Sequence, residues 1–464
     1  MRFDCTAPVS AHSALEEIRS VVREHRGSFL EQLKRFVAQP SVSATGEGVE
    51  DCAKMTEGVL KQLGFRTSTY RPGGTYPVVF GELKSSRSSK TLLLYNHYDV
   101  QPVDPLDEWK TPPFEPRVIQ GKLYGRGVAD DKGDFIARAC AIQALQEKSS
   151  ELPVSLKWVV EGEEEEGSVH LHEYVESHAK ELGADACLWE GSELNPKGRP
   201  HFYLGVKGLL YVEISLKTAE GDRHSMNAPI IPNPAWKLVW ALSKMKGDNE
   251  EIKIGGFYDD VRRPSKEDLA MLEEIEFDDE ETMRLLGVKA FLGGLKGTKL
   301  LERLVFSPTC NIAGFGSGYT GPGSKTIVPG RGMVKIDFRL VPDQKPHDIL
   351  LKLKKFLEDQ GLADAEVTVF GEEMPARTSP STPVVRAASD ACRQVYGVDP
   401  NVWPSMYATG PMALFNNIAR VPSVMVNSVA YPGSSYHAPN EHIFVDHYLK
   451  GIEHLALTFF LYGS

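Results

Sequence analysis

The 464-residue chain has few cysteines, no long apolar run and no surplus of positive charge. Its six cysteines are scattered and include no C-x-x-C pair, which argues against a disulfide framework or a cysteine zinc site. We therefore expect reduced, mostly buried thiols. No apolar run approaches the ~20 residues of a membrane span. The formal net charge of −11 disfavours a nucleic-acid or anionic-membrane partner.

The N-terminal residues 1–6 lack the apolar core of a signal peptide, so we expect a cytoplasmic protein. Charged residues at 25% and hydrophobic residues at 41% are typical of a soluble globular protein. At the usual ~150 residues per domain, the length predicts more than one domain.

Strands and helices alternate through the first part of the chain. Apolar residues at helical spacing predict a helix over 12–38, and a buried strand is expected at 91–96. Further strands are expected at 65–70, 77–83, 154–160 and 185–189, and further helices at 51–63, 134–147 and 168–181. This alternation predicts an α/β fold with a three-layer α/β/α domain.

The pattern changes after Gly208, where the expected order becomes β-α-β-β-α-β and predicts a ferredoxin-like α+β sandwich. Its strands are expected at 209–218, 326–330, 332–341 and 365–370, and its helices at 233–245 and 346–360. Helix 383–396, strand 422–427 and a last helix near 445–461 return to the first pattern. We therefore expect a domain formed by 1–208 and 375–464, with a smaller domain inserted at 209–374 that contains the acidic insertion 246–308.

The buried strand 91–96 runs into His97 and Asp99. On an extended chain, residues two apart point to the same face. An imidazole and a carboxylate therefore emerge together at the carboxyl end of a strand, where ligands bind in open α/β sheets.

A second motif, Gly125–Gly133, presents Asp130 and Asp131 in a glycine-rich turn before a helix. An Asp-rich helix N-cap explains this motif as well as a ligand site does.

Three more motifs lie at strand ends or in loops. Glu163–Glu166 follow strand 154–160 between glycines, and adjacent carboxylates suit a division in which one binds metal and its neighbour handles protons. Glu190 follows strand 185–189, and His437 lies in a loop before the last helix.

Mixed His, Asp and Glu ligands without a thiolate suit zinc, manganese or cobalt. A shared carboxylate would place two ions ~3.5–4 Å apart, as in two-metal hydrolases. A single histidine could be a satisfied core residue, but five such motifs are harder to explain that way. The segment Gly318–Thr326 is not expected to bind phosphate, because its lysine spacing is wrong and it leads into a strand.

In order and spacing, these motifs resemble those of the co-catalytic metallopeptidase family, which includes carnosinases, bacterial glutamate carboxypeptidase, succinyl-diaminopimelate desuccinylase and aminoacylases. The resemblance covers nearly the whole chain. It implies a dinuclear metal hydrolase that cleaves the amide bond of a small peptide or an N-acyl amino acid. The matching residues are His97–Asp99, Gly125–Gly133, Glu161–Glu165, Glu190 and His437.

The resemblance implies two divalent metal ions per chain, with zinc favoured and manganese or cobalt as alternatives. Asp130 would bridge the two ions. His97 and Glu190 would complete one site, and Glu165 and His437 the other.

Three further features follow from the resemblance. Asp99 would hold the His97 imidazole, and Glu164 would be the general base. The peptide after the bridging aspartate is cis in this family, which predicts a cis Asp130–Asp131 bond.

In the inserted domain, His224 matches a family histidine that reaches a neighbouring subunit's active site and stabilises the oxyanion. This implies a homodimer through an inserted lid and dimerisation domain. Asn311 and Arg339 match substrate-holding positions, and a guanidinium suits capture of the substrate's carboxylate. Alternatively, His224 could cap a turn and Arg339 could pair with acidic residues of the lid.

The substrate is left open by departures from the family pattern. Glu190 stands where carnosinase-like dipeptidases usually carry Asp and where carboxypeptidase and deacylase relatives carry Glu. Pro411 replaces a serine of the dipeptidases, and a second lid histidine has no counterpart near 371–375. Dipeptides, peptide C-termini and N-acyl amino acids all remain candidates. A non-catalytic scaffold on a relic peptidase fold is the alternative of another class.

Overall fold

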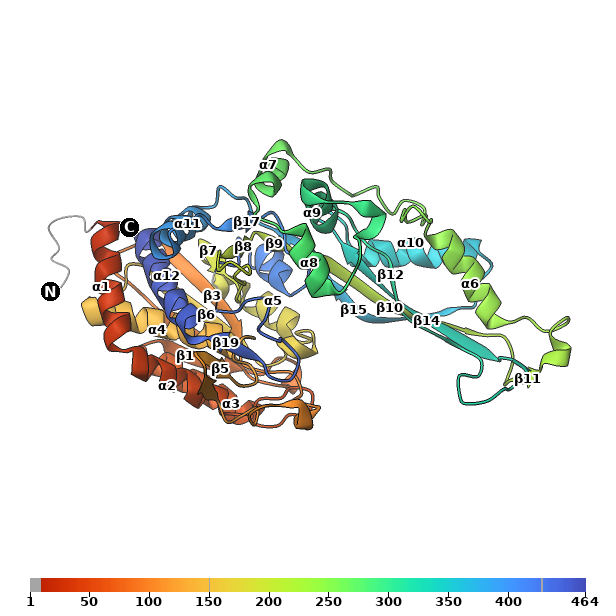
Figure 1. Cartoon of the computed structure of the whole chain (residues 1–464), viewed down its shortest axis with the longest axis horizontal. Helices are drawn as coiled ribbons and strands as arrows, with labels where there is room; N and C mark the ends of the chain where they lie inside the picture. Colours follow the sequence, from red (N-terminus) through yellow and green to blue (C-terminus); the bar gives the residue numbers. More distant parts are fainter. Residues whose placement is uncertain (1–9, 150, 427–428) are drawn as a thin grey trace. The chain divides into compact units, whose positions relative to one another are not determined.

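The computed structural model describes residues 10–149, 151–426 and 429–464 (Figure 1). Cys5, residues 1–6 and the end of the expected strand 422–427 lie outside this part of the chain. The chain divides into two units. Unit 1 consists of Met1–Gly205, Arg377–Pro404 and Leu414–Ser464, and unit 2 of Val206–Ala376 and Ser405–Ala413.

Unit 1 is built on a six-stranded sheet whose central strand is buried after its first residue and apolar over Leu92–Tyr95, as its sequence predicts. This strand, β3 (Thr91–His97), runs parallel to both β6 and β7, and β18 runs parallel to β7. Strand β2 is antiparallel to both of its neighbours, β1 and β6. The sheet order is β1 (Arg66–Tyr70), β2 (Val78–Leu83), β6 (Ser155–Glu161), β3, β7 (Ala186–Leu188) and β18 (Ser423–Val424).

Helices cover the sheet and one another. Helix α4 (Lys132–Lys148) packs on β3 and is buried over nearly its whole length, because α1, α2 and α12 pack against it in turn. The other helices of this unit with their bounds are α1 (Ala11–Glu24), α2 (Arg26–Val37), α3 (Val49–Gln62), α5 (Leu171–Leu182), α11 (Pro383–Tyr396) and α12 (Val445–Gly463).

The expectation of one helix over 12–38 is wrong, because the helix breaks at His25. This residue has φ −93° and ψ 7°, ends α1 and begins α2. Its ring Nε2 lies 2.9 Å from a carboxylate oxygen of Glu147 on α4. Helix α1 packs mainly against α12 and also contacts α4, whereas α2 packs against α4.

Unit 2 contains a four-stranded sheet with α6 (Pro234–Met245) and α10 (Pro346–Asp359) against it. The sheet order is β12 (Asn311–Ser317), β14 (Arg331–Leu340), β10 (Gly208–Lys217) and β15 (Glu366–Glu373). Inward residues of β10 and β14 alternate with outward ones and bury a core with both helices. The chain order β10-α6-β12-β14-α10-β15 has the predicted ferredoxin-like form.

One strand of that prediction is wrong. The second strand of the sheet is β12, and not 326–330. Residues Ile327–Val328 form β13, which pairs with β11 (Arg223–His224) in a separate ribbon. The acidic insertion holds three helices, α7 (Lys266–Glu274), α8 (Asp279–Leu286) and α9 (Gly297–Phe306).

Short strands complete unit 1. A small sheet joins β4 (Arg117–Ile119), β5 (Lys122–Tyr124) and β19 (His442–Phe444), and β8 (His201–Tyr203) pairs with β17 (Asn401–Trp403). The five described cysteines are buried and free, which confirms the expected thiols for this part of the chain. Within the described residues, no helix is long and apolar enough to cross a membrane.

Candidate metal centre

The ends of three parallel strands bring the predicted ligands together. His97 is the last residue of β3, and it lies opposite Glu161, the last residue of β6. A short 3₁₀ helix, Glu164–Glu166, follows β6, and Glu190 follows β7. Because parallel strands end at the same edge of a sheet, these side chains share one side of unit 1.

Asp130 lies at the centre of the cluster. Its Oδ1 is 3.0 Å from His97 Nε2, and its Oδ2 is 3.1 Å from His437 Nε2. His437 Nε2 is also 3.2 Å from a carboxylate oxygen of Glu165, and His97 Nε2 is 3.7 Å from one of Glu190. The structure therefore brings all five predicted ligands together, with a histidine on each oxygen of Asp130.

Asp99 connects two parts of the cluster. Its Oδ1 lies 3.3 Å from His97 Nδ1, while its two carboxylate oxygens accept hydrogen bonds from the backbone N–H groups of Glu164 (3.2 Å) and Glu165 (3.0 Å). Asp99 thus orients the His97 ring and fixes the acidic turn at the same time. Gln101, which the sequence analysis did not single out, donates from its side chain and its backbone to the Glu165 carboxylate (2.9 and 3.2 Å).

The Asp130–Asp131 peptide is cis, as predicted. Asp131 occupies the N-cap position of α4, but its side chain makes no capping hydrogen bond. The carboxylate instead accepts from Asn96 Nδ2 (2.6 Å) and from the backbone N–H of His97 (3.2 Å). The N-cap interpretation of this motif therefore accounts for the position of Asp131 and not for its side chain.

Arg138 is a further residue that sequence reasoning missed. It is fully buried in α4, where it donates to the Tyr95 carbonyl at the end of β3 (2.6 Å) and to the Leu188 carbonyl at the end of β7 (3.2 Å). It also holds the Asn96 side chain at 2.8 Å. In the sequence, a single arginine among the apolar positions of the expected helix 134–147 was the feature that could have indicated a buried, hydrogen-bonded side chain.

The cluster concentrates negative charge in a buried place. Burial, opposed by His97 and assisted by the charge of Asp130, raises the pKa of Glu164 to about 8. Burial and the charge of Asp130 raise the pKa of Glu165 to about 8 as well. Burial and the charge of Glu164 also raise the pKa of Glu190, whose buried Oε2 has no hydrogen-bond partner among the described residues. Divalent cations fit such a site, because they neutralise the carboxylates and can bind the Glu190 oxygen that has no hydrogen-bond partner.

Three predicted residues belong to unit 2 and are not part of this cluster. The Nδ1 of exposed His224 accepts from the Met226 backbone N–H at 3.1 Å, as the turn-capping alternative expects. Asn311 Nδ2 donates to the Asp337 carboxylate at 2.8 Å. The Arg339 guanidinium donates to the Thr409 hydroxyl, and none of the ion pairs among the described residues includes Arg339.

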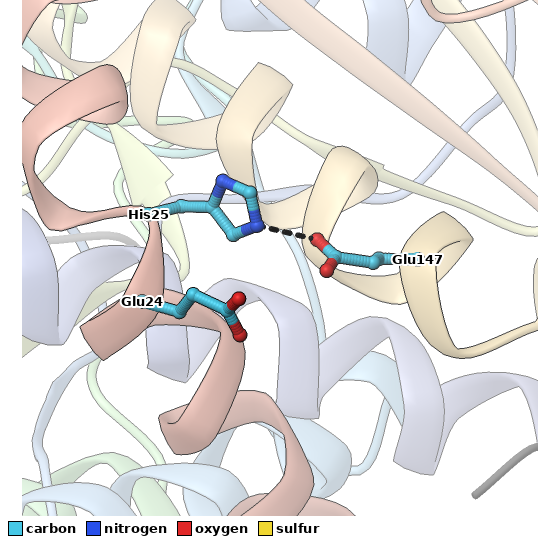
Figure 2. Close-up of side chains that lie close together, drawn as sticks. All are labelled: Glu24, His25 and Glu147. Carbon is cyan, nitrogen blue, oxygen red and sulfur yellow. Dashed lines mark ion pairs between the residues drawn. The ribbon is translucent and has the colours of Figure 1, made fainter.

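A separate group of possible ligands, Glu24, His25 and Glu147, lies at the break between α1 and α2 (Figure 2). Figure 2 shows the His25 ring directed at the Glu147 carboxylate, and both glutamates are exposed. Because the ion pair already explains the geometry, we assign it a structural role at the helix break.

The fold and this cluster of histidines and carboxylates are those that a metal-dependent hydrolase requires. Residues 93–460 match Peptidase family M20/M25/M40, and the chain belongs to this family. The chain is accordingly a hydrolase that acts on peptide bonds, as predicted, and the family implies divalent metal ions.

Relatives align over almost the whole chain. The chain is 29% identical to the Beta-Ala-His dipeptidase of Rattus norvegicus, over 96% of this chain and 95% of that protein. It is 26% identical to the Cys-Gly metallodipeptidase dug1 of Schizosaccharomyces pombe, over 95% and 96%. The crystal structure of the M20 family metallo-carboxypeptidase Sso-CP2 from Sulfolobus solfataricus matches with a TM-score of 0.89 and 42% identity, over 94% of this chain and 99% of that chain.

Proposed function

We propose that this protein is a dinuclear metallopeptidase that releases the C-terminal residue of dipeptides and short peptides. The observation that carries the proposal is Asp130, with His97 on one carboxylate oxygen and His437 on the other. The relatives include dipeptidases and a carboxypeptidase. A dipeptide is the shortest substrate with a peptide bond next to a C-terminal residue. Release of the C-terminal residue is therefore an activity that a dipeptidase and a carboxypeptidase can share.

The same five residues would hold two divalent ions, with zinc favoured. His97 and Glu190 would complete one site around Asp130, and Glu165 and His437 the other. Ions bound there would polarise the scissile carbonyl and lower the pKa of the attacking water.

The protein's own groups would then direct the proton. Glu164 would take the proton of the attacking water on its carboxylate and pass it to the leaving nitrogen. Asp99 supports this role, since it holds the backbone N–H of Glu164 and the ring of His97. Because the turn is held in this way, the Glu164 carboxylate would already lie near Asp130, and no free energy would be lost in orienting it during the reaction.

Recognition of a free carboxylate is proposed for Arg339, with Asn311 as a second substrate contact. Arg339 is supported by its lack of an ion-pair partner among the described residues. Glu190, shared with carboxypeptidase and deacylase relatives, favours hydrolysis at a C-terminal residue. It also supports a second candidate, deacylation of N-acyl amino acids, which carry the same free carboxylate.

We also propose that unit 1 is the catalytic domain and that unit 2 is a lid and dimerisation domain, acting in a cytoplasmic homodimer. Two observations in unit 2 support a partner surface. Trp236 and Trp240 on α6 are each 57% exposed, and β12 is an edge strand whose Ile312 and Phe315 are exposed. In this dimer, His224 would serve the partner's active site and stabilise the oxyanion.

A substrate panel tests the function. The panel contains β-Ala-His, Cys-Gly, a tripeptide, the same peptides with amidated C-termini and N-acetyl amino acids, each with zinc, manganese or cobalt. We expect hydrolysis of free peptides and ~30- to 150-fold slower hydrolysis of amidated ones, because loss of a charge-assisted pair costs ~2–3 kcal/mol. Arg339→Met should abolish that preference. Equal rates on amidated peptides, or activity on N-acetyl amino acids alone, would overturn the proposal.

A further inference from the structure

Glu441 is a buried carboxylate, 1% exposed, that contacts the loop carrying Asp130. Its Oε2 accepts from the backbone N–H of Gly127 (2.9 Å) and from the Arg126 guanidinium (2.9 Å). Its Oε1 accepts from the backbone N–H groups of Ala129 (2.8 Å) and Asp130 (3.2 Å). Both oxygens are therefore used, and three of the four donors belong to the backbone leading into Asp130.

Glu441 also ends the turn that carries His437. In this turn Ser435, His437 and Asn440 all have positive φ angles, 59°, 54° and 66°, which side chains other than glycine adopt at a cost. Such a backbone persists only where its surroundings hold it. Asn440 accepts from the Lys110 backbone N–H at 2.6 Å and donates to the Glu108 carbonyl at 2.9 Å.

The next residues fix the turn from the other side. The Glu441 carbonyl accepts from the Gly125 backbone N–H at 3.1 Å, and strand β19 then continues the pairing with β5. The turn with His437 and the loop with Asp130 are more than 300 residues apart in sequence. Glu441 connects the turn to the loop through hydrogen bonds of both its side chain and its main chain.

We propose that Glu441 is a positioning residue, which sets the Asp130 loop and the His437 turn in one register so that both reach the same metal ions. This inference rests on the proposed function. A carboxylate is required, because every group around it is a donor. An amide at this position would turn an N–H₂ group toward backbone N–H groups and leave buried donors unpaired.

The test uses Glu441→Gln in the full-length protein. Metal affinity is measured by titrating the metal-free protein with zinc and cobalt, and site geometry is read from the visible absorption of the cobalt form. We expect metal affinity to fall 10–100-fold, as for other residues that orient ligands. We also expect an altered cobalt spectrum and a lower kcat at a nearly unchanged KM.

Glu453→Gln is the matched control. This largely buried carboxylate also lies beside an arginine, Arg19 at 3.4 Å, but it belongs to α12. The Glu453→Gln variant should have the metal affinity and the cobalt spectrum of the wild type. If Glu441→Gln does not fold, the same measurements are made on Glu441→Asp, which keeps the charge on a shorter side chain and should weaken metal binding in the same direction.

Wild-type affinity and an unchanged cobalt spectrum in the folded variant would overturn the inference. That result is distinct from failure of the proposed function, in which the wild-type protein itself would bind no metal or hydrolyse no peptide.

Discussion

Glu164 and Glu166 are neighbours in one acidic turn, but their surroundings differ. Glu166 is exposed, whereas burial and the charges of Asp130 and Glu165 raise the pKa of Glu164. We predict that Glu164→Gln lowers kcat by at least ~10²–10⁴-fold, the usual contribution of a general base, while metal content is unchanged. Glu166→Gln should keep near-normal activity. Steady-state kinetics and metal analysis of both variants test this prediction. A fully active Glu164→Gln enzyme would contradict the role of Glu164 as the general base.

Single residues also show where prediction from sequence ends. The proposed metal ligands lie in motifs at strand ends and in loops that the sequence singled out, and the family resemblance supplied their individual roles. Gln101, Arg138 and Glu441 could not be assigned, because each acts on a group that is distant in sequence. Their partners exist only once β3, β7 and the final turn have been brought together.

Among the elements, α11 and α12 pack through a buried histidine. His454 of α12 contacts the Ala388 carbonyl of α11 at 3.0 Å through Nε2, and its buried Nδ1 has no partner among the described residues. Burial lowers the pKa of His454 to about 4, against 6.5 as its ordinary value. Protonation thus favours the unfolded state, so stability is full above pH 6.5 and falls as the pH drops from 6.5 toward 4.

This predicts a pH-dependent difference between variants. When the pH is lowered from 7 to 5, the free energy of unfolding should fall by about 2 kcal/mol less in His454→Phe than in the wild type. Both proteins are measured without metal. Urea unfolding at the two pH values measures the difference. His172→Phe, at an exposed position on α5, is the control and should behave as the wild type. If His454→Phe showed the same pH dependence of stability as the wild type, His454 would not be the group responsible for it.

The elements also differ in how well their sequences predict them. Strand β3 was predictable because it is apolar and buried on both sides. Strand β12 was missed because Gly314 and Gly316 interrupt its pattern and its outer residues are exposed at the sheet edge. The break at His25 was missed because the apolar spacing of α1 continues into α2, and Gly27, two residues after His25, was not taken as a sign of a helix end.

At the scale of the whole molecule, the exposed tryptophans of α6 bear on the proposed dimer. The ring centroids of Trp236 and Trp240 lie 5.8 Å apart, and both side chains are exposed, so together they form one apolar surface. We predict that the double variant Trp236→Glu/Trp240→Glu is monomeric by light scattering, because two charges would have to be buried in the interface.

That monomer should lose at least ~10²-fold in activity, the usual contribution of an oxyanion donor, because His224 could no longer reach a partner's site. Leu351→Glu, at an exposed position on α10, is the control and should stay dimeric and active. A monomer with full activity would contradict the role of His224 in a partner's site. A variant that stays dimeric would contradict the assignment of α6.

The central claim is that Asp130 joins two metal sites, and metal counting tests it most directly. Each protein is stripped with a chelator, reloaded with zinc, dialysed and analysed for zinc per chain. We predict about two ions in the wild type and about one in His97→Ala and in His437→Ala, and near-complete loss in Asp130→Ala, with activity lost in all three. Two ions retained in Asp130→Ala, or a single ion in the wild type, would contradict the account.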